Sequence, residues 1–181
     1  MSAARRPGAA GAVGDAPVIG RLSLDDRIAL AALIEATGQF RPSELAVALE
    51  VFDEAFAPGG GGGVDPGIYA WLAARDATLA LIGVACWGRT PHTRRTCDLY
   101  WLAVAPTQQG RGIGHQLVEA AEAAMRVDGA RLSVVEASGR LESAKVRRFY
   151  ERQGYERSAV VTDFYAPDDD RVTYIHRLRQ N

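Results

Sequence analysis

Residues 104–114 of this chain, Val-Ala-Pro-Thr-Gln-Gln-Gly-Arg-Gly-Ile-Gly, constrain its fold more than any other segment. Residues 99–104 are rich in aromatic and branched side chains, and Pro106, which has no N–H group for a sheet, follows them; this pattern predicts a strand. After the glycines, apolar residues recur every three or four positions, which is typical of an amphipathic helix. They are Ile113, Leu117, Val118, Ala121, Ala124 and Met125.

Three alternating glycines, Gly110, Gly112 and Gly114, stand where the predicted helix begins. Glycines let the backbone approach a ligand closely, and the first amide groups of a helix have no partner within it. The helix dipole places partial positive charge at the same end, so a diphosphate is a suitable ligand. Glycine clusters also occur in ordinary turns, and a loop without a ligand stays open as an alternative.

Two common nucleotide motifs do not fit these glycines. A P-loop needs a lysine directly after its glycines, but Lys145 is the only lysine in the chain. A dinucleotide fingerprint needs Gly-x-Gly-x-x-Gly and an acidic residue about twenty positions later, which the glycine spacing here does not provide.

A second motif, Arg-Arg-Phe-Tyr-Glu-Arg-Gln-Gly-Tyr, occupies residues 147–155. Together with residues 104–114 it resembles the two signatures of the GCN5-related N-acetyltransferase (GNAT) family: Gln/Arg-x-x-Gly-x-Gly/Ala for acyl-CoA, and Phe-Tyr-x-x-x-Gly-Phe/Tyr. The resemblance extends over residues 18–179. It implies an α/β fold of mixed α+β type, in which helices flank a central, mixed and largely antiparallel seven-stranded sheet.

The resemblance implies acetyl-CoA as co-substrate and assigns residues to it. The amides of residues 109–114 would bind the pyrophosphate, and main-chain groups near the end of the central strand would bind the pantetheine arm, where residues 99–104 separate from residues 132–137. The implied ligands are Leu102, Ala103, Val104, Gln109, Gly110, Arg111, Gly112, Ile113 and Gly114. Ser143 stands where many members carry a pantetheine-binding asparagine; it is a candidate ligand or only a helix cap.

Tyr150 matches the family's helix tyrosine that faces the coenzyme sulfur, so we expect it to contact the coenzyme and to protonate the departing thiolate. The alternative is an aromatic side chain that only fills the core. For the general base we expect Glu136, because it interrupts an apolar strand where burial would make a carboxylate a better base. A carboxylate paired with an arginine is the alternative there. Asp98, Tyr100 and Glu35 are further candidates for the base.

The acceptor is expected to contact Phe40, Arg41, Tyr100 and Tyr165. Arg41 offers a bidentate clamp for a carboxylate, unless it is simply a solvated surface side chain. Residues 163–170 combine aromatic side chains with several aspartates, which suits a cationic amine; a polar hairpin turn is the alternative.

Residue patterns predict the order of elements along the chain. We expect strands at 18–22, 69–73, 79–87, 99–104 and 132–137 and a final hairpin joined by 166–170, with helices from 23, at 43–56, from 113 and at 143–153. The glycine run 59–63 predicts a loop on the active-site side.

Length and composition suit one globular domain, with 181 residues of which 48% are hydrophobic and 24% charged. We expect residues 1–17 to form a flexible tail and residues 18–181 a single domain. A net charge of −1 disfavours nucleic acid and anionic membranes as partners. Without a long apolar run or a secretory signal we expect a cytoplasmic protein, and the scattered His and Cys residues predict no metal site.

These observations predict an acetyl-CoA-dependent N-acetyltransferase in which a primary amine of a small molecule, amino acid or peptide attacks the thioester directly. The resemblance also makes a homodimer a possible assembly. One alternative is a non-catalytic module that binds acyl-CoA for regulation. Another is a nucleic-acid binder built on Arg89, Arg94 and Arg95, which the low overall basic charge disfavours.

Overall fold

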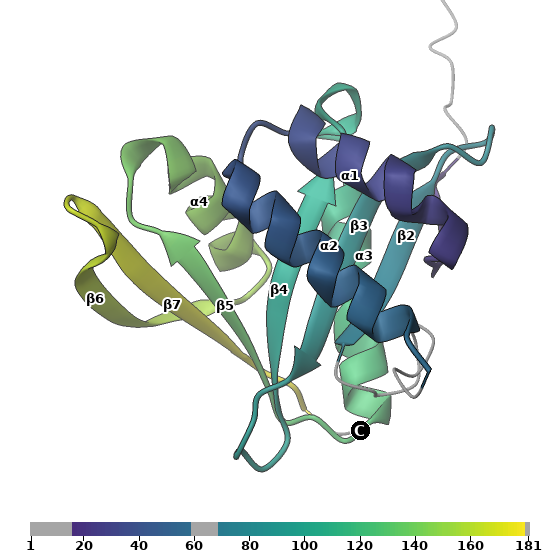
Figure 1. The fold of residues 1–181 in the computed structure, drawn as a ribbon. Coiled ribbons are helices and arrows are strands. Elements are labelled where there is room, and N and C mark those ends of the chain that lie inside the picture. The colour runs from purple at the N-terminus through teal and green to yellow at the C-terminus, as the bar shows by residue number, and fades with distance from the viewer. Residues whose placement is uncertain (1–15, 59–68, 180–181) are drawn as a thin grey trace, which may run out of the picture.

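The computed structural model describes residues 16–58 and 69–179, and its centre is a sheet covered by helices on both faces (Figure 1). In this part of the chain the sheet has seven strands in the order β1-β2-β3-β4-β5-β7-β6. The strands are β1 Val18–Arg21, β2 Tyr69–Arg75, β3 Leu81–Arg89, β4 Thr96–Val104, β5 Leu132–Ser138, β6 Glu156–Ala166 and β7 Asp169–Arg177. The expected mixed, largely antiparallel architecture is confirmed, because only β4 and β5 of these neighbours run parallel.

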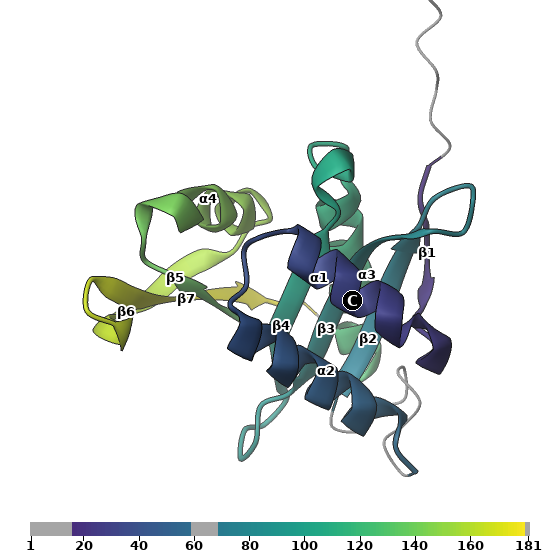
Figure 2. The ribbon, with the colours of Figure 1, turned by 45° about the horizontal axis from the view of Figure 1, so that its top comes forward.

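Four α-helices cover the sheet in the described part of the chain. They are α1 Arg27–Ala36, α2 Pro42–Phe56, α3 Ile113–Val127 and α4 Ala144–Arg152. Helices α1 and α2 lie across one face and α3 lies behind the other (Figures 1 and 2). Side chains of α3 and α4 share one hydrophobic core cluster, and those of α1 and α2 belong to a second cluster on the opposite face. None of these helices is long and apolar enough to cross a membrane.

Most predicted elements are found within a few residues of their expected ends. Strand β3, for example, begins at Leu81 instead of 79. Leu79 has a φ of 67° and lies in a turn, because the Asp76 carboxylate accepts hydrogen bonds from the amides of Thr78 (2.9 Å) and Ala80 (3.1 Å). The glycine run 59–63 and residues 1–15 of the expected tail lie outside the described residues.

Strands β4 and β5 separate soon after they meet. Their parallel register contains three pairs, the last of which joins Asp98 to Val134. Beyond it β5 stays paired with β7 as far as Ser138, while β4 continues alongside β3 to Val104. Figure 1 shows the two strands diverging toward their carboxyl ends. The second half of β4 therefore has one edge without a neighbouring strand, as the resemblance implied.

A β-bulge at Tyr100 changes which face the second half of β4 presents. In the register with β3, Trp87 pairs with Leu99 and Cys86 with Trp101, so Tyr100 is an extra residue. Before the bulge, Cys97 and Leu99 pack on the α3 side. After it, the α3 side receives Leu102 and Val104, whereas Trp101 and Ala103 pack below α1 and α2. Simple alternation along the strand does not predict this change of phase.

Close packing of α3 against β3 gives the first prediction. A Cβ atom at Gly83 would lie 3.0 Å from Leu117 Cδ1, 3.2 Å from Ile113 Cγ2 and 3.3 Å from the Ala103 carbonyl oxygen. We expect Gly83→Ala to lower the free energy of unfolding by about 1–3 kcal/mol, because overpacking a dense core forces its neighbours to shift. Urea denaturation measures this change.

Gly20→Ala is the matched control for this substitution, because Gly20 lies in β1 and a Cβ atom there would meet no atom within 4 Å. We expect its unfolding free energy to stay within about 0.5 kcal/mol of the parent protein. Equal midpoints for the parent and the Gly83 variant would contradict the packing argument.

Candidate active site

The loop that joins β4 to α3 depends on two glycines in the left-handed backbone region. Gly110 has a φ of 78° and Gly112 a φ of 81°. A Cβ at either position would meet no atom within 4 Å, so backbone conformation is the constraint there, not space. The turn at Gly112 starts α3 directly, since Gly112 is its N-cap residue.

The same loop leaves a series of amide groups unpaired. In residues 16–58 and 69–179, no acceptor binds the N–H groups of Gln109, Gly110, Arg111 and Gly112. The first turn of α3 adds further amides without helical partners, at the positive end of the helix dipole. Such a cluster of donors binds a diphosphate well, because it offers hydrogen bonds and positive charge together.

Side chains tie this loop to its neighbours. Gln109 Nε2 donates a hydrogen bond to the Val104 carbonyl oxygen (3.2 Å), and Lys145 Nζ donates one to Gln109 Oε1 (3.4 Å). Arg111 Nη1 donates to Gln108 within the loop (2.6 Å). Gln109 therefore connects the free end of β4 with α4.

Gly114 allows α4 to approach the start of α3. A Cβ atom at Gly114 would lie 3.3 Å from the Phe149 ring. One helical turn further along α4, a hydrogen bond of 2.6 Å joins His115 Nδ1 and Gln153 Oε1. The third glycine of the loop thus serves helix packing, and this packing fixes the position of the residue after Phe149, which is Tyr150.

Tyr150 is 6% exposed and lies between two aromatic rings. Its ring centroid is 5.2 Å from that of Phe149 and 5.5 Å from that of Tyr155. Among the described residues, the hydroxyls of Tyr155 and Tyr174 have side-chain partners, whereas that of Tyr150 has none. Burial raises the pKa of Tyr150 above its usual range, so the hydroxyl is protonated at neutral pH.

Glu136 is not buried as expected, since its side chain is 43% exposed. Along β5, Val135 and Ala137 enter the core below α3, and Glu136 takes the opposite face. Arg171 Nη1 lies 3.3 Å from Glu136 Oε1, so the carboxylate is paired with an arginine. The Arg171 guanidinium also stacks on the Phe164 ring at 4.0 Å.

Ser143, the candidate coenzyme ligand, differs in its surroundings from Asp98 and Glu35, two further candidates for the base. Ser143 is the N-cap residue of α4, but its side chain makes no capping hydrogen bond. Asp98 accepts a hydrogen bond from Thr90 Oγ1 (2.7 Å). Glu35 is exposed on α1. In the described chain, no group of three His, Cys, Asp or Glu side chains could hold a metal ion.

The acceptor candidates come from both sides of the separation between β4 and β5. Phe40 packs against the core below α1 and α2. Arg41 is exposed and held by Glu44, whose Oε2 accepts from the Arg41 amide (2.7 Å) and lies 3.4 Å from its Nε. Tyr100 is 40% exposed and packs edge to face on Tyr69, with ring centroids 5.5 Å apart.

Tyr165 is affected by charged side chains from both sides of the separation. Burial raises its pKa, and the negative charges of Glu136, Asp169 and Glu44 act in the same direction. Glu44 belongs to the first turn of α2 and Glu136 to β5, so Tyr165 is within electrostatic range of both sides. The structure thus brings Tyr165, Glu136 and the Arg41–Glu44 pair into one region.

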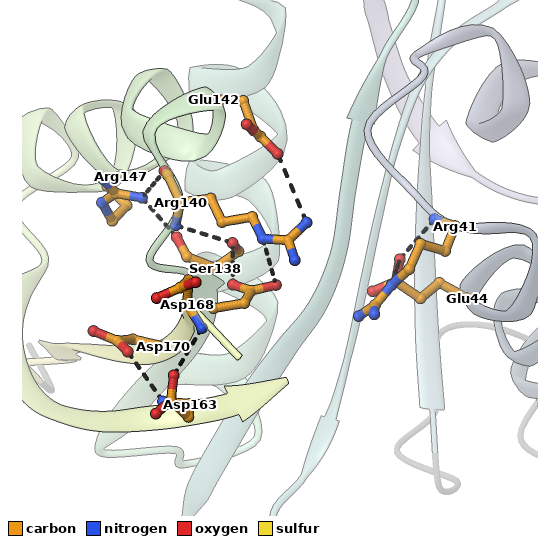
Figure 3. A network of polar contacts seen from close by, with 10 residues as sticks. Arg41, Glu44, Ser138, Arg140, Glu142, Arg147, Asp163, Asp168 and Asp170 are labelled. Carbon is orange, nitrogen blue, oxygen red and sulfur yellow. Dashed lines mark hydrogen bonds and ion pairs between the residues drawn. The ribbon is translucent and has the colours of Figure 1, made fainter. Parts of the chain in front are cut away.

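The aspartates of the final hairpin are mostly occupied by the turn itself (Figure 3). Asp163 Oδ1 accepts a hydrogen bond from the Asp168 amide (2.7 Å), and Asp170 Oδ1 accepts one from the Asp163 amide (3.1 Å). Asp169 is 4% exposed and lies 3.3 Å from Arg140 Nε. These contacts agree with the polar-turn alternative for residues 163–170.

Arg147 is a structural residue that the sequence analysis did not single out. Its Nη1 donates hydrogen bonds to the carbonyl oxygens of Ser138 (2.6 Å) and Arg140 (2.7 Å). Figure 3 shows Arg147 beside these residues. It therefore fastens α4 to the end of β5. Its place next to the Phe-Tyr motif was the only signal in the sequence, and that signal does not reveal the partner.

Comparison with known proteins assigns the family. Residues 66–157 match the acetyltransferase (GNAT) domain. A solved structure from Desulfovibrio desulfuricans, assigned to the GNAT family of acetyltransferases, is 37% identical with a TM-score of 0.83, and the match covers 91% of this chain and 100% of that chain. The chain belongs to the GNAT acetyltransferase family, whose members use acetyl-CoA.

Two further relatives are more distant. Mycothiol acetyltransferase from Beutenbergia cavernae is 33% identical over 103 residues, which are 57% of this chain and 33% of that protein. The chain thus spans about a third of that relative's length. An aminoglycoside 6'-N-acetyltransferase complexed with coenzyme A shares the fold, with 17% identity, a TM-score of 0.68 and coverage of 91% of this chain and 98% of that one.

Tyrosine ionisation gives a prediction from these surroundings. All six tyrosines have a raised pKa, with burial as the main cause. The folded protein therefore holds tyrosine protons to higher pH than the unfolded chain. We expect these tyrosines to make their full contribution to stability below pH 10, the usual tyrosine pKa. The free energy of unfolding should then decrease as the pH rises further.

Phenolate absorbance near 295 nm in native and in urea-unfolded protein measures the two titrations. We expect the native curve to lie at higher pH than the unfolded curve. The urea concentration at the unfolding midpoint should decrease as the pH is raised from 9 to 11. A native curve that coincides with the unfolded one would contradict the burial argument.

Proposed function

We propose that this protein transfers the acetyl group of acetyl-CoA to a primary amine by direct attack within a ternary complex. The observation that carries the proposal is the row of unpaired amides at Gln109–Gly112, next to a helix that holds a protonated Tyr150 in the core. The amides would bind the pyrophosphate, and the unpaired edge of β4 at Leu102–Val104 would bind the pantetheine amides as an added strand does.

In this mechanism the amine nitrogen attacks the thioester carbonyl carbon, and the C–S bond breaks as the tetrahedral intermediate collapses. The Tyr150 hydroxyl donates its proton to the departing sulfur. The amine proton goes to a carboxylate, for which we propose Glu136, either directly or through water. Its exposure and its position on β5, beside the separation from β4, leave the carboxylate accessible to an acceptor.

The acceptor would lie between the Arg41–Glu44 pair and the hairpin, against the rings of Tyr100 and Tyr165. Both ion pairs there, Arg41–Glu44 and Arg171–Glu136, are accessible to solvent. They offer carboxylates to an ammonium group and guanidinium groups to a carboxylate. This mixture suits small polar amines such as amino acids, peptide N-termini or amino sugars.

A thiol-release assay with a panel of such amines tests the proposal, together with calorimetry of acetyl-CoA binding. We expect micromolar to millimolar KM values for at least one amine class. Binding of acetyl-CoA without thiol release from any amine would favour the alternative, a regulatory module that binds acyl-CoA. Absence of binding would overturn the coenzyme site itself.

Tyr150→Phe tests the proton donor. It keeps the ring packing with Phe149 and Tyr155 and removes only the hydroxyl, so we expect acetyl-CoA affinity to change less than threefold, while kcat falls about 100-fold. Steady-state kinetics and calorimetry measure both quantities. Tyr174→Phe, which removes a hydroxyl bonded to Glu151, is the control and should leave kcat unchanged. Parental kcat in Tyr150→Phe would exclude the role.

Glu136→Gln tests the base. The amide cannot accept the amine proton, so we expect kcat/KM to fall about 100-fold. The loss should be smaller at high pH, where more of the amine is already neutral. A pH series from 6 to 9.5 measures this. Glu142→Gln, which changes an exposed carboxylate near Arg140, is the control. A pH-independent loss would contradict proton transfer to Glu136.

A further inference from the structure

Helix α4 carries a row of basic side chains on its exposed side. Lys145, Arg148 and Arg152 recur at spacings of three and four residues and are all exposed. Residues with this spacing lie above one another on a helix surface. With a rise of about 1.5 Å per residue, the row extends for about 10 Å. We call these three residues the α4 basic row.

Arg148 and Arg152 are the two members of the α4 basic row without any side-chain partner in the described chain. Within the described residues, Arg148 and Arg152 take part in no ion pair or side-chain hydrogen bond. Arg147, the residue directly before Arg148, by contrast donates two hydrogen bonds from Nη1 to carbonyl oxygens at the end of β5. The nearby Glu151 accepts a hydrogen bond from the Tyr174 hydroxyl (3.2 Å). Two unpaired guanidinium groups on one helix face leave a local excess of positive charge.

The α4 basic row begins beside the loop of residues 105–112, which joins β4 to α3. Lys145 Nζ reaches Gln109 Oε1 at 3.4 Å. Phe149 contacts Gly114, and Gln153 bonds His115, so positions 145, 149 and 153 face the loop and α3. Arg148 and Arg152 each precede one of these inward positions by a single residue. Arg148 and Arg152 therefore lie beside the contact between α4 and the loop, which we call the seam.

Charge differs between the two helices that border this seam. On α3, the residues that follow the loop include the exposed Glu119, which lies 3.5 Å from His115 Nε2, and the buried Glu122. On α4 the flanking residues are arginines. Glu122 is paired with Arg126 of the same helix (3.0 Å) and with His176 (2.7 Å), so among the described residues α3 shows no unpaired arginine comparable to those of α4. A second anionic group on a ligand held by the loop is thus attracted toward α4.

We propose that the α4 basic row binds the 3'-phosphate of the coenzyme A ribose, with Arg148 and Arg152 as its ligands. This rests on the proposed function, which places the pyrophosphate at the loop. Coenzyme A carries this phosphomonoester one sugar ring away from its pyrophosphate, and the row provides cations over a comparable span. Guanidinium groups suit such a phosphate because they bind it through two parallel hydrogen bonds. Arg148 and Arg152 then distinguish coenzyme A from dephospho-coenzyme A.

The experiment compares acetyl-CoA with acetyl-dephospho-CoA, which lacks only the 3'-phosphate. Calorimetry measures both Kd values for the parent protein, Arg148→Gln, Arg152→Gln and the double variant. We expect the parent to bind acetyl-CoA at least tenfold more tightly, since hydrogen bonds to charged groups contribute this much. In the double variant the two Kd values should differ by less than twofold. The change should come only from weaker binding of acetyl-CoA, with the Kd of acetyl-dephospho-CoA unchanged.

Arg21→Gln is the matched control, because Arg21 is an exposed arginine on β1 at the other edge of the sheet. It should keep the parental ratio. Equal affinity of the parent for both thioesters would overturn the proposal, and this comparison needs no variant. A double variant that weakens both thioesters by the same factor would also overturn it. Binding of neither thioester would instead contradict the proposed function.

Discussion

The separation of β4 from β5 is the constraint on which the rest of this site depends. The two parallel strands pair over three residues and then part, because each is held by a different neighbour. Strand β4 follows β3 through the bulge at Tyr100, whereas β5 is paired with β7 along its whole length. An unpaired strand edge inside a domain leaves amide and carbonyl groups without partners. Such an edge can accept an extended, amide-bearing ligand as an added strand, which is the role that the proposed function gives it.

The far side of the separation is held open by contacts at the end of β5. Arg147 binds two carbonyl oxygens there, and the buried Asp169 is paired with Arg140. Gly139 is required at this corner, since a Cβ atom would lie 2.8 Å from Asp170 Cβ. The hairpin, the end of β5 and α4 are thereby joined into one unit. Tyr150 belongs to that unit, while the glycine loop of residues 105–112 joins β4 to α3.

The sequence predicted the order of elements and the loop better than it predicted the surroundings of single side chains. Glycine chemistry is local, so Gly110 and Gly112 could be assigned their backbone role without a structure. Burial of Glu136 could not be judged, because it depends on α1 and α2 covering β2 to β4 but leaving the outer face of β5 open. The bulge at Tyr100 and the partners of Arg147 depend likewise on contacts between distant segments.

The net charge of −1 conceals a division of charge that matters for the chemistry. Helix α4 carries Lys145, Arg147, Arg148 and Arg152 against the single acid Glu151. The region between α2 and the hairpin contains Glu44, Glu136 and Asp169, each paired with an arginine. Under the proposed function, a coenzyme with several negative charges would meet the basic side of α4, and a cationic amine would meet these carboxylates.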